Sequence, residues 1–177
     1  MILALATAAG VIITALMLIV TIRQNRDTKY LQFIKDTDEE LSEMIKEEPK
    51  LDSRDSCIIY AYNYIDICDR IMFVIKKGII SKEFFTYYLD FFNYSVTMMW
   101  WYTVTYPTDI HSLNSSWNML TKWIKDENNE FPSKAHPYPI MHLPQKMKEL
   151  LPTNEQTKDE VKILESLRTH MDKIRTN

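Results

Sequence analysis

The chain has 177 residues, with 21 basic against 24 acidic side chains and a formal net charge of −3. Nucleic-acid-binding domains usually show a clustered basic excess, so this balance predicts no nucleic-acid partner. Only 2 glycines are present, whereas phosphate-binding loops and strand-rich folds depend on glycine for positive φ and close backbone approach. The composition therefore predicts a helical protein and no cofactor.

The first stretch, residues 2–22, carries no charged residue and no proline. At about 1.5 Å rise per residue, a helix of this length spans roughly 30 Å, the thickness of the hydrocarbon core of a bilayer. A secretory signal peptide is the weaker interpretation, because no basic residue precedes the stretch and no small-residue cleavage pattern follows it. We therefore expect a transmembrane helix, with the membrane lipid bilayer as its surroundings.

The charges after this stretch predict its orientation. Arg23, Arg26 and Lys29 follow it, against the single acidic residue Asp27. By the positive-inside rule, the N-terminus then lies outside and the C-terminal domain lies in the cytoplasm. We expect a single-pass protein of the cell membrane.

The stretch also has a face of small residues. Ala6, Gly10 and Thr14 are four positions apart, a spacing that allows another transmembrane helix to approach closely. We expect this face to bind a membrane protein partner or a second copy of the chain. The alternative is that small residues are simply common in such helices.

The rest of the chain is expected to be helical. Residues 23–47 contain no glycine or proline and predict a stalk that continues the first helix. A break follows, and Asp52 or Ser53 can cap a second helix that ends in a basic turn before Gly78. With the elements below, the chain divides into an anchor, a stalk, a helical core domain, a proline-containing extended segment and a helical tail, over residues 1–22, 23–47, 52–125, 126–144 and 145–177.

A third helix is expected from Ser81, as its cap, to about Thr105, forming an antiparallel hairpin with the second. Residues 84–106 are apolar enough to raise the alternative of a second membrane span. Asp90 and Asn93 make that alternative costly in lipid, although the sequence leaves it open.

Three shorter elements are expected after the hairpin. A short helix is expected from residues 116–117 to Lys125. Four of its side chains are expected to face inward: Trp117, Leu120, Trp123 and Ile124. A short helical turn is expected over residues 145–151. The last helix is expected over residues 154–174, with Thr153 and Gln156 as a capping box and an inward seam at Leu164, Leu167, Met171 and Ile174.

The second helix holds the candidate chemistry. Asp66, Asp69 and Arg70 lie on its apolar part, and Asp90 of the third helix can meet them across the hairpin. A structural polar network is the favoured interpretation, since a partly buried carboxylate needs a partner. The sharper alternative is an acid/base or ligand site.

Metal and thiol chemistry have little support in the sequence. The nearest set of metal ligands, Asp109, His111, His136 and His142, lacks ligand spacing, so no metal site is expected. Cys57 and Cys68 are eleven positions apart on one helix, roughly 16 Å at the helical rise. A disulfide requires Cα atoms within about 7 Å, so both are expected to be free and buried.

Two segments carry a resemblance to a known group. The basic segment IRQNRDTKYLQFIKDTDEEL is followed by NYIDICDRIMFVIKKGIISKEFF and an aromatic helix with tryptophan. This arrangement resembles the DUF4760-like uncharacterised prokaryotic proteins, whose pattern is NYhEhhAhhhKKGhhDEEhh with h apolar. The chain departs from it at Asp66, where the pattern has glutamate, and at Asp69 and Arg70, where it has small or apolar residues. The resemblance covers about half the chain and implies a membrane anchor with a small helical domain, but no activity.

The expected fold is all-α, with one N-terminal transmembrane helix followed by a cytoplasmic helical bundle of four to five helices. The expected function is that of a non-catalytic single-pass membrane-anchored helical protein, which acts through protein–protein interaction at the membrane. Two alternatives stay open. One is a small accessory subunit of a larger membrane protein complex, and the other is an enzyme using a buried carboxylate site around Asp66 and Asp90.

Overall fold

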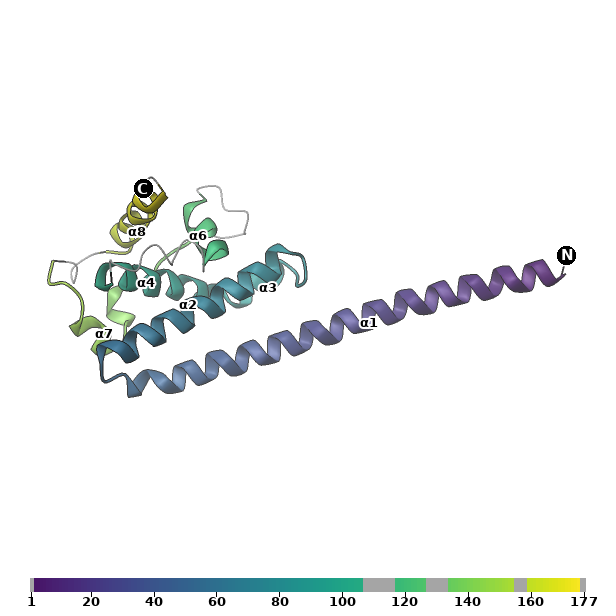
Figure 1. The fold of residues 1–177 in the computed structure, drawn as a ribbon, viewed down its shortest axis with the longest axis horizontal. Helices are drawn as coiled ribbons and strands as arrows, with labels where there is room; N and C mark the ends of the chain where they lie inside the picture. Colours follow the sequence, from purple (N-terminus) through teal and green to yellow (C-terminus); the bar gives the residue numbers. More distant parts are fainter. Residues whose placement is uncertain (1, 107–116, 127–133, 155–158, 176–177) are drawn as a thin grey trace. The chain divides into compact units, whose positions relative to one another are not determined.

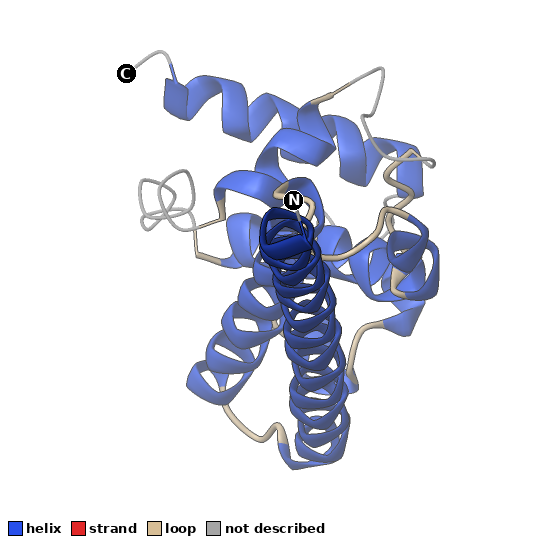
Figure 2. Cartoon of the chain, turned by 90° about the vertical axis from the view of Figure 1, so that its right-hand side faces the viewer, coloured by secondary structure: helices blue, strands red, loops and turns tan. Residues whose placement is uncertain are grey.

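A computed structural model describes residues 2–106, 117–126, 134–154 and 159–175, with side chains from Leu16 to Lys173. These residues form α-helices and short 3-10 turns, and no strand occurs among them (Figure 2). The all-α prediction is therefore confirmed. The chain divides into two compact units, Met1–Asp38 and Glu39–Asn177.

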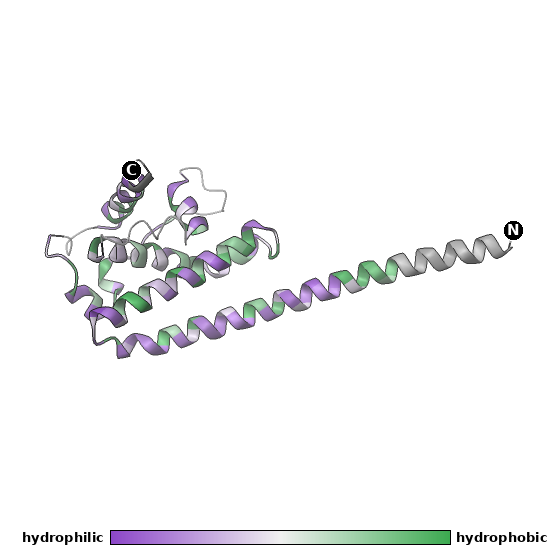
Figure 3. Cartoon of the chain, viewed as in Figure 1, coloured by the Kyte–Doolittle hydropathy of each residue, from purple (hydrophilic) through white to green (hydrophobic). Residues whose placement is uncertain are grey.

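The first unit is formed by the greater part of α1 (Ile2–Glu47), whose last turns belong to the second unit. The predicted stalk is therefore helical and continuous with the preceding stretch. Figure 3 shows an apolar band at the start of the described side chains, which then gives way to a hydrophilic stretch. Among the described residues, no helix combines the length and the apolar character needed to cross a membrane.

The second unit begins with the last turns of α1, a short 3-10 turn, η1 (Glu48–Lys50), and then α2 (Arg54–Lys76). Ser53 caps α2 through a capping box. Its hydroxyl accepts a hydrogen bond from the Ser56 backbone N–H at 3.1 Å, and the Ser56 hydroxyl accepts one from the Ser53 N–H at 3.1 Å. At the other end, Gly78 adopts φ +67°, the left-handed conformation that favours glycine after a helix. Both ends of the helix agree with the sequence prediction.

The predicted third helix is wrong in one respect, because it is broken at Tyr88. The structure has α3 (Glu83–Tyr87) and α4 (Leu89–Thr105), and Tyr88 between them has φ −97° and ψ 10°. This bend leaves the Tyr88 ring fully buried and in edge contact with Phe84, with ring centroids 5.1 Å apart. The predicted Ser81 cap is also wrong, since Lys82 precedes the helix and supplies no side-chain cap.

Helix α4 forms the centre of the second unit and lies beside α2 (Figure 1). Most of its side chains are buried, among them Trp100 and Trp101. α8 lies against α4 as well, so α4 has neighbours on more than one side. This burial accounts for the apolar character that suggested a second membrane span.

The remaining elements are α6 (Asn118–Lys125), η3 (Ile140–His142), α7 (Gln145–Glu149) and α8 (Glu160–Arg175). The four side chains predicted to turn inward around α6 are all buried: Trp117, Leu120, Trp123 and Ile124. The short helical turn predicted at residues 145–151 is confirmed as α7. α8 packs on both α4 and α6.

The start of the last helix is a correction. It was expected at residue 154, but Asn154 lies in a turn and α8 begins at Glu160. The cap is Asp159, whose carboxylate accepts a hydrogen bond from the Lys162 N–H at 2.9 Å. Gln156 of the predicted capping box lies outside the described residues.

The inward face of α8 also differs from the predicted seam. Ile163, Leu167 and Met171 are buried, whereas Leu164 is half-exposed. The side chain of Ile174 lies outside the described part. A repeat of four residues thus describes the buried face better than the expected alternation of three and four.

Candidate functional site

Among the predicted polar residues, Asp69 on α2 forms a hydrogen bond to the backbone of another helix. Its carboxylate accepts a hydrogen bond from the backbone N–H of Leu120 at 2.7 Å. Leu120 is the third residue of α6, and Trp117 before that helix supplies no side-chain cap. The first amides of a helix lack partners within it, so Asp69 caps α6 from a different helix.

Burial sets the protonation behaviour of Asp69. Burial raises the pKa of this carboxyl, while hydrogen bonds from the Leu120 and Met119 backbone lower it, and the charge of Asp66 raises it. The net effect is a raised pKa, because loss of hydration outweighs the two amide bonds. The carboxylate is a strong hydrogen-bond acceptor for α6, but its ionised form loses hydration in the folded chain.

Asp66 and Arg70 form the second part of the predicted network. Arg70 Nε lies 3.2 Å from Asp66 Oδ2, one helical turn earlier, and Arg70 Nη2 pairs with Glu40 of α1. Both pairs are about half-exposed, which limits their contribution to roughly 0–1 kcal/mol each. The pair of Arg70 with Glu40 joins the last turns of α1 to α2 inside the second unit.

A groove of about 290 Å³ lies beside these pairs. The last turns of α1 and the middle of α2 line it with four acidic side chains, one arginine and three uncharged side chains: Glu40, Glu43, Met44, Glu47, Asn63, Asp66, Ile67 and Arg70. Arg70 already engages two of the carboxylates, so the groove is a surface feature around an ion-pair network.

Asp90 does not share the partners of Asp66. It is exposed on α4, and its carboxylate adds to burial in raising the pKa of the Tyr138 hydroxyl. In the structure, Asp66 pairs with Arg70, Asp69 contacts α6, and Asp90 lies near Tyr138 in the segment after residue 134. The four predicted residues act in three separate contacts.

A polar row on α4 was missed in the sequence. Asn93, Thr97 and Trp101 recur every four residues along α4. Asn93 Oδ1 accepts from the His136 backbone N–H at 3.0 Å, and Thr97 donates to the Tyr138 carbonyl at 2.8 Å. Trp101 Nε1 donates to the carbonyl of Met147 at 2.8 Å. This row fixes the extended segment and α7 to α4, and its spacing was the available signal.

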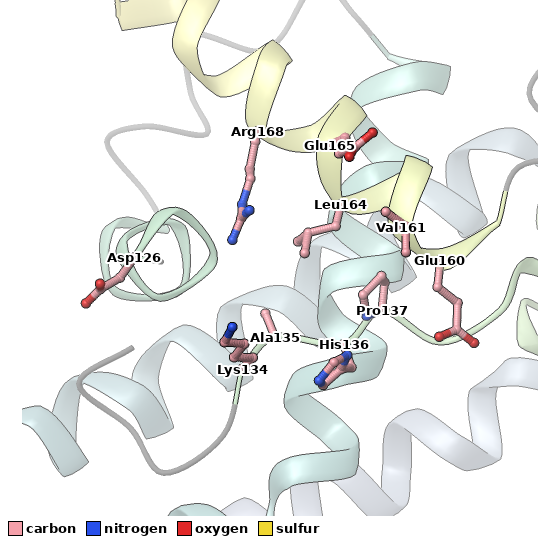
Figure 4. Close-up of a pocket in the computed structure, with 10 residues that line it drawn as sticks. All are labelled: Asp126, Lys134, Ala135, His136, Pro137, Glu160, Val161, Leu164, Glu165 and Arg168. Atoms are coloured by element: carbon pink, nitrogen blue, oxygen red, sulfur yellow. The ribbon is translucent and has the colours of Figure 1, made fainter. Parts of the chain in front are cut away.

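A cavity outside these contacts has a volume of about 460 Å³ (Figure 4). It lies between residues 134–137, the end of α6 and the outer face of α8. Arg168 points into it and donates from Nε to the Ile124 carbonyl at 3.1 Å. Its charged lining mixes both signs, with Lys134 and Arg168 against Asp126, Glu160 and Glu165, so its charge selects no class of ligand.

The thiols and histidines offer little reactive chemistry. Cys57 and Cys68 are free and buried, and burial raises the pKa of both thiols, which favours the thiol over the reactive thiolate. Among the described residues, no three His, Cys, Asp or Glu side chains are placed to hold a metal ion. Asp109 and His111 of the weighed ligand set lie outside that part, as do the side chains of Ala6, Gly10 and Thr14.

No protein-family model matches the chain, and neither the curated proteins nor the solved structures give a match. The resemblance to the DUF4760-like proteins therefore stays a prediction from the sequence pattern.

Proposed function

We propose that this chain is a non-catalytic, single-pass membrane-anchored protein that acts through protein–protein contacts at the membrane. The observation that carries the proposal is the uncharged stretch of residues 2–22, followed by Arg23, Arg26 and Lys29. Its length matches the hydrocarbon core of a bilayer. The flanking charges favour an orientation with the N-terminus outside and the helical second unit in the cytoplasm.

The described end of this stretch supports the proposal. The side chains from Leu16 to Val20, and that of Ile22, are each more than half exposed. Consecutive residues of a helix point to all its sides, so one neighbouring helix cannot cover such a run. A bilayer surrounds a helix completely and removes this apolar surface from water.

The contacts in the second unit support a non-catalytic role. Asp69 caps a helix, and Asp66 pairs with Arg70, so these groups have structural partners. The alternative of an enzyme around Asp66 and Asp90 loses support because these two carboxylates contact different residues. The buried thiols lack the lowered pKa of a nucleophile.

An accessory subunit of a larger membrane complex is the second candidate. The face formed by Ala6, Gly10 and Thr14 favours it, because small residues four apart permit close helix contact. The same face also fits a homo-oligomer.

Substitution on that face tests the proposed interaction. Gly10→Leu fills the groove and should reduce recovery of a stoichiometric partner, or of a homo-oligomer, in mild detergent. Val11→Leu changes a neighbouring side of the helix and serves as the matched control. Both variants should remain in the membrane fraction. Equal recovery for Gly10→Leu and the unaltered chain would reject this face as the partner site.

A further inference from the structure

The turn between α2 and α3 exposes apolar and basic side chains together. We propose that residues 73–87, which comprise the end of α2, the turn after it and α3, bind the surface of an anionic lipid membrane. We call this segment the α2–α3 tip. The proposal adds a second membrane contact to the proposed function and rests on its bilayer setting.

The apolar side chains of the tip are unusually open for a well-packed unit. Phe73, Ile79 and Tyr87 are 41%, 49% and 66% exposed. Their neighbours Ile80 and Phe85 are almost completely buried. The tip is therefore packed against the core of the unit while these three side chains are exposed to solvent. Phe and Tyr rings are well suited to the boundary between headgroups and acyl chains.

The charge of the tip complements an anionic surface. Lys76, Lys77 and Lys82 are exposed and are opposed within the tip only by Glu83, so its formal charge is positive in a chain whose net charge is −3. Lysines near an anionic leaflet are attracted by its negative surface potential. Their alkyl stems can lie along apolar surface while the ammonium groups remain at the headgroups. This combination favours lipid over an acidic protein, which would need no exposed aromatic rings.

The tip lies at the end of the second unit where the chain arrives from α1. Glu40 pairs with Arg70, whereas Glu48, further along the chain, contacts Tyr60. The end of α1 therefore runs antiparallel to α2. α2 continues past Arg70 to Lys76, about 9 Å at the helical rise, away from the turn that joins the two helices. The chain therefore enters the second unit at this end, and the proposed anchor is the earlier part of the same helix α1.

A fluorescent probe on the intact chain tests the proposal. Ile79→Cys can be labelled selectively with an environment-sensitive dye, because Cys57 and Cys68 are fully buried. The labelled chain is reconstituted into vesicles of phosphatidylcholine with phosphatidylserine, and into vesicles of phosphatidylcholine alone. We expect a blue-shifted emission and quenching by spin-labelled lipid in the anionic vesicles, with both effects lost in phosphatidylcholine.

Two variants provide the controls. Met141→Cys carries the same dye on an exposed residue whose carbonyl accepts a hydrogen bond from Lys148 of α7. α7 lies near the start of α2 rather than its end (Figure 1), so this probe should show no shift. Lys77→Glu with Lys82→Glu reverses the charge of the tip and should abolish the shift at residue 79. Both substitutions are at exposed positions, and circular dichroism checks that the helices are intact.

The outcomes separate this proposal from the proposed function. Chain that alkaline carbonate strips from both kinds of vesicle would contradict the anchor. Chain retained in the vesicles with an unshifted probe at residue 79 would overturn the tip alone. A shift that is equal in neutral vesicles, or that appears only with added membrane proteins, would also overturn it.

Discussion

The carboxylate of Asp69 on α2 and the backbone N–H of Leu120 on α6 are joined by a hydrogen bond of 2.7 Å. α6 has eight residues and no cap of its own, and helices of this length depend on tertiary contacts. The bond supplies the missing cap across 51 positions of sequence. It thereby ties the position of α6 to α2.

Substitutions at Asp69 should separate the cap from the charge. Asp69→Ala removes the acceptor and should lower the free energy of unfolding by about 1–2 kcal/mol. Asp69→Asn keeps an acceptor oxygen and removes the buried charge, so at pH 7 it should be at least as stable as the unaltered chain. Urea unfolding of the intact chain in mild detergent, followed by circular dichroism, measures both.

The pH dependence follows from the raised pKa of Asp69. The folded chain holds this proton more tightly than the unfolded chain, whose ordinary value is 3.8. The stability due to the protonated group is complete below that value and is lost as the pH rises through the folded pKa. The advantage of Asp69→Asn should therefore shrink toward pH 3. Asp66→Asn is the control, and it should instead lose up to about 1 kcal/mol with the Arg70 pair. An Asn variant at position 69 that is less stable than the unaltered chain at pH 7 would contradict this account.

Thr97 should be needed to hold the extended segment. Its hydroxyl donates to the Tyr138 carbonyl, and Thr97→Val leaves that carbonyl without this donor. We expect the free energy of unfolding to fall by about 1–2 kcal/mol. Thr103→Val is the matched control, since Thr103 is equally buried but bonds only the Trp100 carbonyl of its own helix. A similar loss for both variants would show that the contact with Tyr138 adds nothing.

The two thiols should be inert in the folded chain. Cys57 and Cys68 have no exposed surface, and burial raises the pKa of each. Ellman's reagent should detect no rapidly reacting thiol before denaturation and both thiols after it. Fast reaction of either cysteine in the folded chain would mean that the region around α2 opens readily.

The sequence predicted the long helices well because their signals are local. Ser53 and Gly78 mark the ends of α2 through capping and positive φ, and both positions hold in the structure. Burial of α4 on more than one side removed the usual amphipathic pattern, so the break at Tyr88 had no periodic signal. Tyr88 at the break is fully buried, and its neighbours in the sequence give no signal for that.

The polar contacts were harder to predict because they join distant segments. Asp69 was recognised as a polar residue on an apolar helix, but its partner is an amide of α6. The row of Asn93, Thr97 and Trp101 binds backbone groups whose chemistry is the same in every sequence. Neither partner can be read from residue type, so the grouping of Asp66, Asp69, Arg70 and Asp90 into one network was too coarse.

The central claim is that the chain is anchored by residues 2–22 with its helical domain inside the cell. The most direct measurement places an epitope tag after Asn177 and adds protease to intact cells, with alkaline carbonate extraction in parallel. The account predicts a tag that is digested only after permeabilisation, in a chain that stays with the carbonate-washed membranes. Replacing Ile12 and Ile13 with arginine should release the chain, since each charge costs about 2.5–3.5 kcal/mol in mid-membrane, whereas Gln24→Arg with Asn25→Arg should not. A tag digested in intact cells would contradict the orientation, and unaltered chain released by carbonate would contradict the anchor.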